Sequence, residues 1–323
     1  MTPITRRSLM LGTLAVPFAR SALAQTGAGN VTRITVPFPP GGTVDPIARM
    51  VQPGLQQRLG STIIIENKPG ASGSIGAAVV AKSPPDGSNW LFVFDTHAIN
   101  PFLQNLSFDT EKDLEPVLLI GTAPNVVATH PERPFKTFAD VIAAAKAKPE
   151  GITYGSIGSG SLGHLTMVLL SQRAGVKMVH VPYRGGGPLM NDALAGHIDV
   201  AIGSAALVTP QVSGGKLRAL AQTSAKRVPG LADVPTVIES GFAGFESYAW
   251  WGSFTAGRTP REVVERFSNA LAETLREPEI KKRIEAMQIT LEIGGPDVQR
   301  KFLAEQMKLW GPVVKEHNIK SDS

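Results

Sequence analysis

Residues 34–51 read ITVPFPPGGTVDPIARMV, and this stretch guides the interpretation of the rest of the chain. A short apolar run ends in Pro-Phe-Pro-Pro-Gly-Gly, and a pattern typical of an amphipathic helix follows it. Such a strand-to-helix corner predicts one unit of an α/β sheet. Gly41 and Gly42 would let the backbone approach a ligand closely. Asp45, followed by Pro46 at a first helical position, is predicted to be the N-cap of the helix.

The alternation of apolar runs and amphipathic stretches continues along the chain. Buried strands without polar alternation, separated by helical patterns, favour mostly parallel sheets covered by helices on both sides. Two such units, residues 31–121 and 131–224, are joined by candidate crossings near residues 123–128 and 244–251, and the chain ends in helical patterns. If these last helices pack on the first unit, the protein has two hinged lobes with a cleft at the carboxyl ends of both sheets.

The first 24 residues predict an export signal. They combine Arg6-Arg7, a short apolar run and an Ala-x-Ala site before Gln25, which is typical of a twin-arginine signal peptide. The net charge of +5 depends on this segment, because the rest of the chain carries 29 basic and 27 acidic residues. The balance argues against nucleic-acid binding. The chain has no cysteine, so disulfides and a lipid-anchored cysteine are excluded. We expect a free, exported protein.

The stretch Gly158–Gly163 matches the G-x-G-x-x-G pattern of dinucleotide-binding loops and opens a predicted helix. The acid that would hold a ribose is missing, because residues 151–191 contain no Asp or Glu. A helix start with free N–H groups, serine hydroxyls and no nearby acid favours an anion instead. No cofactor is expected. Arg184, in a second glycine-rich turn, could pair with a carboxylate or point to solvent.

A secreted hydrolase is the competing prediction. It would use Ser159 or Ser161 with His164, but the sequence lacks a complete nucleophile elbow or triad signature. The histidines show no metal-ligand spacing. We therefore predict a protein that is neither an enzyme nor a metalloprotein.

Several segments together resemble the Bug family, the periplasmic solute-binding receptors of tripartite tricarboxylate transporters. They include VPFPPGGTVDPIARMV, ENKPGASGSIGAAVVAKSPPDG, THAINP, YGSIGSGSLGHL and HVPYRGGGPLMNDALAGHIDV, in family order. The resemblance implies a two-lobed α/β fold of the periplasmic-binding-protein kind (type II-like). Its domains would be residues 25–125 plus 250–323 for lobe 1 and residues 126–249 for lobe 2, after a signal peptide over residues 1–24.

The resemblance also implies a binding site for a carboxylate between two helix starts, one from each lobe. The implied ligand-binding residues are Phe38, Gly41, Gly42, Thr43, Asp45, Thr96, His97, Ser156, Ser159, Gly160, Ser161, His164, Tyr183, Arg184 and Ser204. Asp45 would be close to the ligand in addition to capping the helix. Asp95 and the pair Trp250-Trp251 depart from the family pattern, and each could face either the cleft or the core.

The implied function is capture of a small organic anion in the periplasm and its delivery to a membrane permease. Dicarboxylates, tricarboxylates, amino acids and aromatic acids all remain possible ligands, and a role in feeding a sensor kinase is an alternative. We expect a monomer.

Overall fold

The computed structural model describes residues 31–320, so the predicted signal peptide lies outside the described residues. Its strands form one curled, mixed sheet in the order β2-β1-β3-β9-β4-β7-β5-β6, with β10 and β8 also paired to β4. The strands are β1 (Val31–Val36), β2 (Thr62–Asn67), β3 (Asn89–Phe94), β4 (Leu114–Thr129), β5 (Thr153–Ser156), β6 (Val179–Pro182), β7 (Val200–Ser204), β8 (Arg218–Gln222), β9 (Tyr248–Ala256) and β10 (Thr290–Gly294).

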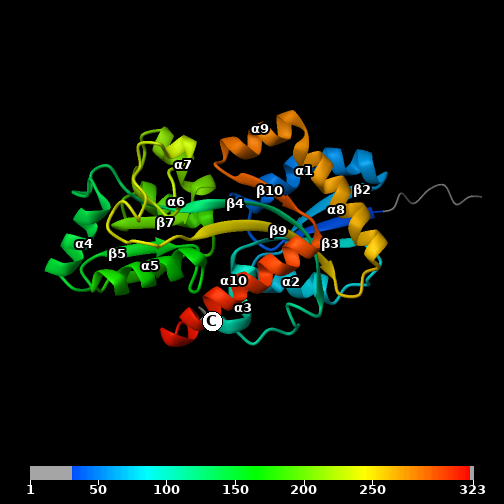
Figure 1. The fold of residues 1–323 in the computed structure, drawn as a ribbon, viewed down its shortest axis with the longest axis horizontal. Coiled ribbons are helices and arrows are strands. Elements are labelled where there is room, and N and C mark those ends of the chain that lie inside the picture. Colours follow the sequence, from blue (N-terminus) through cyan, green and yellow to red (C-terminus); the bar gives the residue numbers. More distant parts are fainter. Residues whose placement is uncertain (1–30, 321–323) are drawn as a thin grey trace, which may run out of the picture.

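Helices cover both sides of this sheet, as the sequence predicted (Figure 1). They are α1 (Val44–Leu59), α2 (Ser74–Ala81), α3 (Thr96–Leu103), α4 (Phe138–Ala147), α5 (Leu162–Ala174), α6 (Gly186–Leu194), α7 (Ala205–Ser213), α8 (Arg261–Arg276), α9 (Pro278–Ala286) and α10 (Pro296–Glu316). None of the helices within residues 31–320 is both long and apolar enough to cross a bilayer.

Two strands connect the lobes (Figure 1). The first part of β4 pairs antiparallel with β9, from Leu114 opposite Ala256 to Pro124 opposite Tyr248. From Asn125 onward, β4 pairs with β7, which belongs to the second lobe. The end of the expected first unit (residues 31–121) and the expected crossing near residues 123–128 are therefore one continuous strand, and the sheet is mixed where we expected mostly parallel pairing. The division at residues 125/126 and 249/250 stays a prediction.

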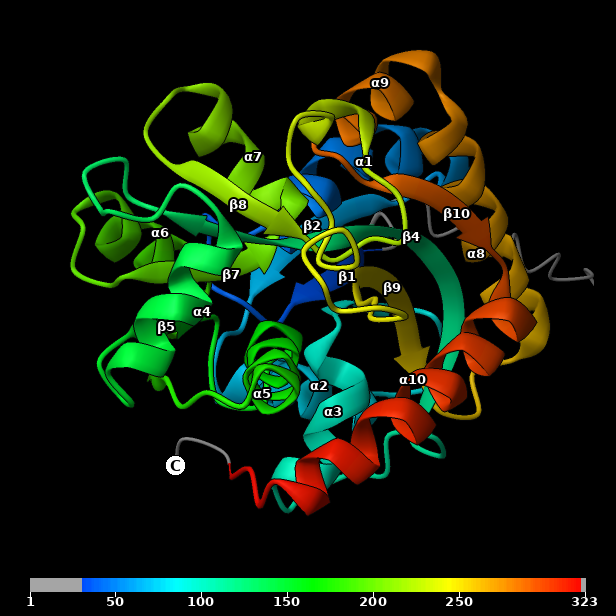
Figure 2. The same cartoon turned by 60° about the vertical axis from the view of Figure 1, so that its left-hand side comes forward.

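The C-terminal helices pack on the first lobe, so the chain passes between the lobes twice. Helix α10 lies along α3 and against β4, and α8 lies against α1 (Figure 2). Trp90 of β3 stacks on Phe267 of α8 with ring centroids 3.7 Å apart, and both side chains are almost fully buried. This apolar contact joins the end of the chain to the first sheet.

Four strands are each followed by a helix that begins at the same edge of the sheet. β1, β5, β6 and β7 end next to the starts of α1, α5, α6 and α7 respectively. Because helix N-termini carry partial positive charge, this edge gathers positive potential between the lobes.

Candidate functional site

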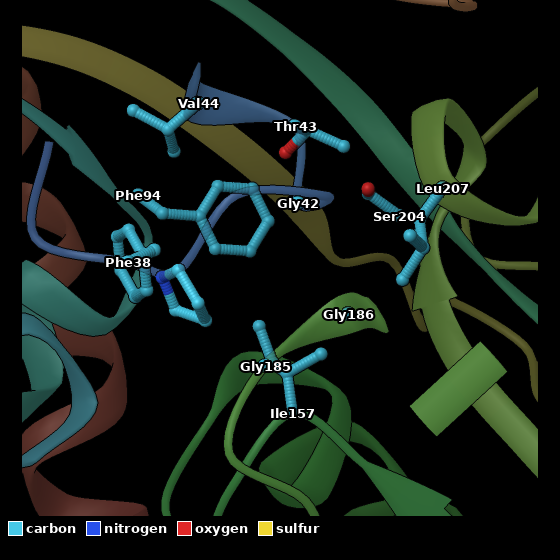
Figure 3. A pocket seen from close by; sticks show the side chains of 11 residues that line it. Phe38, Gly42, Thr43, Val44, Phe94, Ile157, Gly185, Gly186, Ser204 and Leu207 are labelled. Carbon is cyan, nitrogen blue, oxygen red and sulfur yellow. The ribbon is translucent and has the colours of Figure 1, made fainter. Parts of the chain in front are cut away.

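A pocket lies between the lobes at this edge (Figure 3). Its cavity volume is about 40 Å³, so the two lobes lie close together around it in this structure. Its lining residues are Phe38, Pro39, Gly42, Thr43, Val44, Phe94, Ile157, Gly185, Gly186, Ser204 and Leu207.

Three helix N-termini converge on the pocket. Thr43, Gly185 and Ser204 are the N-cap residues of α1, α6 and α7, and all three line it. Within the described chain none of these helices has a side-chain hydrogen bond at its cap, so their first-turn N–H groups are not taken by a capping side chain. The lining contains no acidic or basic side chain among the described residues. The arrangement attracts an anion through backbone dipoles, without a charged side chain.

Thr43 is held in place by a tryptophan. The Nε1–H of Trp251 donates to the Thr43 hydroxyl oxygen across 3.0 Å. Since that oxygen already accepts a hydrogen bond, the hydroxyl proton of Thr43 is left to donate to a ligand oxygen. Trp251 is buried and its ring lies 5.1 Å from that of Phe94, so it supports the pocket wall from below. Trp250 faces the other way and packs edge-on against Phe302 of α10.

The rest of the wall is apolar. Phe38 and Phe94 meet edge to face with ring centroids 6.4 Å apart, and Ile157 and Leu207 come from the second lobe (Figure 3). These side chains would cover the hydrocarbon part of a ligand.

Asp45 is not the N-cap of α1, and that prediction was wrong. The helix begins at Val44, and the Asp45 carboxylate accepts hydrogen bonds from Arg49 Nε and Asn67 Nδ2, both at 2.9 Å. Burial acts to raise the pKa of Asp45, but these two hydrogen bonds outweigh it and the pKa lies below its usual value. Asn67 also donates to the Phe38 carbonyl at 3.1 Å, so Asp45 helps to fix the loop after β1.

The start of α5 turns its polar groups inward. Ser156 and Ser161 are fully buried, and the Ser161 hydroxyl donates to that of Ser156 at 3.1 Å. Ser161 also caps α5, because its Oγ accepts from His164 N–H at 3.3 Å. The Gly160 N–H donates to His164 Nδ1 at 2.9 Å. With Nδ1 of His164 accepting from the backbone and the Ser161 hydroxyl directed at Ser156, Ser161 and His164 do not form a nucleophile–base pair.

The histidine after β3 belongs to the core of the first lobe. His97 is buried with its ring 4.6 Å from that of Phe254, and burial lowers its pKa to about 3. The Thr96 hydroxyl donates to the Ser72 carbonyl at 2.9 Å. Neither residue lines the pocket.

Asp95, just before them, is 2% exposed. Burial raises the pKa of its carboxyl well above the usual range.

Of the predicted site residues, Phe38, Gly42, Thr43 and Ser204 line the pocket. Tyr183 donates its hydroxyl to Asp192 at 2.7 Å, and Arg184 is exposed. Gly41 lies in the loop after β1 at φ +92° and does not line the pocket, nor do Ser159 and Gly160 at the start of α5. Sequence reasoning missed Pro39, Val44, Phe94, Ile157, Gly185, Gly186 and Leu207. The glycine run after β6 was the available signal for two of them. No group of His, Asp and Glu within residues 31–320 could hold a metal ion.

Comparison with known proteins gives a consistent result. The family model "Tripartite tricarboxylate transporter family receptor" matches residues 47–319. Protein BugT of Bordetella pertussis is 30% identical over 300 residues, which cover 92% of this chain and 92% of that protein. The periplasmic binding protein BugD superimposes with a TM-score of 0.84 at 30% identity, covering 90% of this chain and 98% of that one. The R. palustris protein Rpa4515, solved with adipate, has a TM-score of 0.85 at 30% identity and coverages of 90% and 97%.

Proposed function

Because this chain belongs to the tripartite tricarboxylate transporter receptor family, we propose that its interlobe pocket captures a small organic carboxylate for a membrane permease of that transporter type. The chain is a solute-binding receptor and not an enzyme, which confirms both predictions made from the sequence. We propose that it acts in the periplasm, because the similar protein BugD is described as a periplasmic binding protein. That it acts as a monomer stays a prediction.

The convergence of three helix N-termini on one pocket is the observation that carries this proposal. N–H groups at the starts of α1, α6 and α7, together with the hydroxyls of Thr43 and Ser204, supply donors for carboxylate oxygens. These groups come from both lobes, so a bound anion would bridge them and favour the closed arrangement. The presence of adipate in Rpa4515 supports a carboxylate as the ligand class.

The test is a thermal-shift screen of the purified protein against a carboxylate library, followed by isothermal titration. A ligand that binds the folded state raises the melting temperature with concentration. Ser204→Ala removes a hydroxyl at the start of α7 and should raise the Kd about tenfold or more, as expected for a hydrogen bond to a charged group. Ser213→Ala, at the exposed far end of the same helix, is the matched control and should leave the Kd unchanged. A library without a binding carboxylate, or equal Kd values for both variants, would contradict the proposal.

A further inference from the structure

Gln288 has a backbone conformation that is usual for glycine at its position. It follows helix α9 with φ +60°, in the left-handed region. Its N–H donates to the Glu285 carbonyl at 2.8 Å, and the next N–H along the chain donates to the Ile284 carbonyl at 3.4 Å. These two bonds form the Schellman arrangement of a helix end, in which a side chain at this position is strained. The strain at Gln288 indicates a role for its side chain.

The side chain of Gln288 reaches the opposite lobe. Its Oε1 accepts a hydrogen bond from the N–H of Gly230 across 2.9 Å. Gln288 connects α9 to β10 in the first lobe, whereas Gly230 lies in the loop after β8 in the second. A Cβ at position 230 would lie 2.2 Å from the Gln288 amide, so the absence of a side chain there permits the approach. We call this hydrogen bond the latch.

The loop that carries Gly230 is fixed to the second lobe by Gln222. Gln222 is fully buried at the end of β8, and its Nε2 donates to the carbonyls of Leu231 and Val234 at 2.9 and 2.8 Å. Its Oε1 accepts from the Val228 N–H at 2.9 Å. The side chain thus holds the loop on both sides of Gly230. The donor of the latch therefore keeps a fixed place relative to β8.

Both partners of the latch are tied to β4, on opposite sides of the crossing between the lobes. Thr290, at the start of β10, pairs with Thr122, and Gln222 pairs with Val126. A bend of β4 between Thr122 and Val126 would move β10 relative to β8 and change the separation of the latch atoms. The latch therefore responds to a hinge motion between the lobes.

A groove of about 690 Å³ lies beside the latch. It is lined by Val228 and Pro229 from the second lobe and by Ile289 and Leu291 from the first, among others. Gly230 is exposed, so the latch can break and form again without unpacking a core. In this structure the ligand pocket is nearly shut, with a cavity of about 40 Å³, and the latch is formed in that same arrangement.

We propose that Gln288 is a positioning residue for ligand retention, because the latch forms when the lobes close and holds them closed from outside the pocket. The latch forms after the ligand has entered the cleft. Breaking it should therefore speed up dissociation of the ligand and leave association unchanged. This inference rests on the proposed function, because it concerns the release of the ligand from the same pocket.

The test measures association and dissociation rates by stopped-flow fluorescence, using the tightest binder among adipate, malate, hexanoate and benzoate. Gln288→Gly removes the latch and relieves the backbone strain. Its dissociation rate should rise about two- to fivefold, as for the loss of a neutral hydrogen bond at the surface, with an unchanged association rate. Its melting temperature should be no lower than that of the wild type. Gln288→Glu keeps an acceptor oxygen for the Gly230 N–H and should dissociate at the wild-type rate or more slowly.

Two further variants separate the latch from other effects. Gly230→Ala breaks the latch from the second lobe and should raise the dissociation rate by a similar factor. The double variant Gly230→Ala/Gln288→Gly should dissociate no faster than either single variant. Glu150→Gly is the matched control, because Glu150 is an exposed residue of the second lobe that also has φ +60°. It relieves the same kind of strain away from the latch and should leave both rates unchanged.

The outcomes distinguish this inference from the proposed function. If a carboxylate binds but Gln288→Gly does not change its dissociation rate, or if the effects in the double variant are additive, the latch is overturned and the proposed function stands. Faster dissociation with a lower melting temperature, not repeated by Gly230→Ala, would mark a purely structural role and also overturn it. If no carboxylate binds, the proposed function fails. Small-angle scattering of the ligand-free protein then tests the latch alone, because Gln288→Gly should have a larger radius of gyration than Gln288→Glu, and equal radii would overturn it.

Discussion

The hydrogen bond between Trp251 and Thr43 allows a quantitative test of how the pocket binds a carboxylate. Trp251→Phe keeps an aromatic ring beside Phe94 and removes only the indole N–H donor and part of the ring. The Thr43 hydroxyl would then be free to rotate and would no longer be oriented as a donor toward the pocket. A neutral hydrogen bond contributes about 0.5–1.5 kcal/mol net, so we expect the Kd to rise about two- to tenfold.

Thr43→Val removes the hydroxyl itself and with it a hydrogen bond to a charged group. That loss corresponds to about 1.5–3 kcal/mol, or a Kd about ten- to 150-fold higher. Because Trp251 is expected to act through Thr43, the double variant should bind like Thr43→Val alone. Isothermal titration with the tightest-binding carboxylate of the screen gives the four Kd values of this double-mutant cycle.

Trp250→Phe is the matched control. It removes an indole that is equally buried but packs against Phe302, away from the pocket. Each tryptophan variant should lose about 0.5–3 kcal/mol of unfolding free energy, but only Trp251→Phe should weaken binding. Fully additive effects in the double variant, or equal Kd changes for the two tryptophan variants, would refute the reasoning.

Two further predictions concern pH and closure. The pKa of His97 is about 3 in the folded protein, against an ordinary value of 6.5. As the pH falls, His97 in the unfolded chain is therefore protonated before His97 in the folded protein. The stability that this group contributes above pH 6.5 is lost as the pH falls toward 3. Between pH 6.5 and pH 5 the loss from this group is about 1.6 kcal/mol, and urea unfolding should show it in the wild type but not in His97→Leu. Equal pH dependence in both proteins would exclude His97 as its source. Gly160→Ala would place a Cβ 2.0 Å from a methyl group of Leu103 in the opposite lobe, at φ +74°. We expect small-angle scattering to show a more open protein and titration to show weaker ligand binding. The double variant Gly160→Ala/Leu103→Ala should partly restore closure and binding. If it does not, backbone strain alone causes the effect of Gly160→Ala.

The order of the strands up to β8 was predictable from the sequence because it depends on local patterns, whereas β9 and β10 were not predicted as strands. The strands β4 and β9 overlap the expected crossings near residues 123–128 and 244–251, while the lobe boundaries stay a prediction. The continuity of β4 was not predicted, because Pro124 and Gly121 suggest a break. Pairing with β9 and β7 keeps this segment extended, and such pairing depends on residues far away in the sequence.

The candidate site was predictable in type but only partly in position. The glycine and serine content of the turns indicated anion binding at helix starts. Which helix starts face the pocket depends on tertiary contacts. Thr43 meets Gly185 and Ser204 at the pocket although these residues lie far apart in the sequence, and no local pattern indicates which helix starts come together.

The place of β9 has a consequence for how the protein is made. β9 lies between β3 and β4, yet it follows the whole second lobe in the sequence. In a chain emerging from the ribosome, the strands from β4 through β8 lie within residues 114–222. They can pair with one another before β9 has been synthesised. During that interval β3 has a partner only on the side of β1, and its other edge is open. That edge, together with the edge of β4 that later pairs with β9, is exposed to mispairing with other chains until residues 248–256 arrive and cover both.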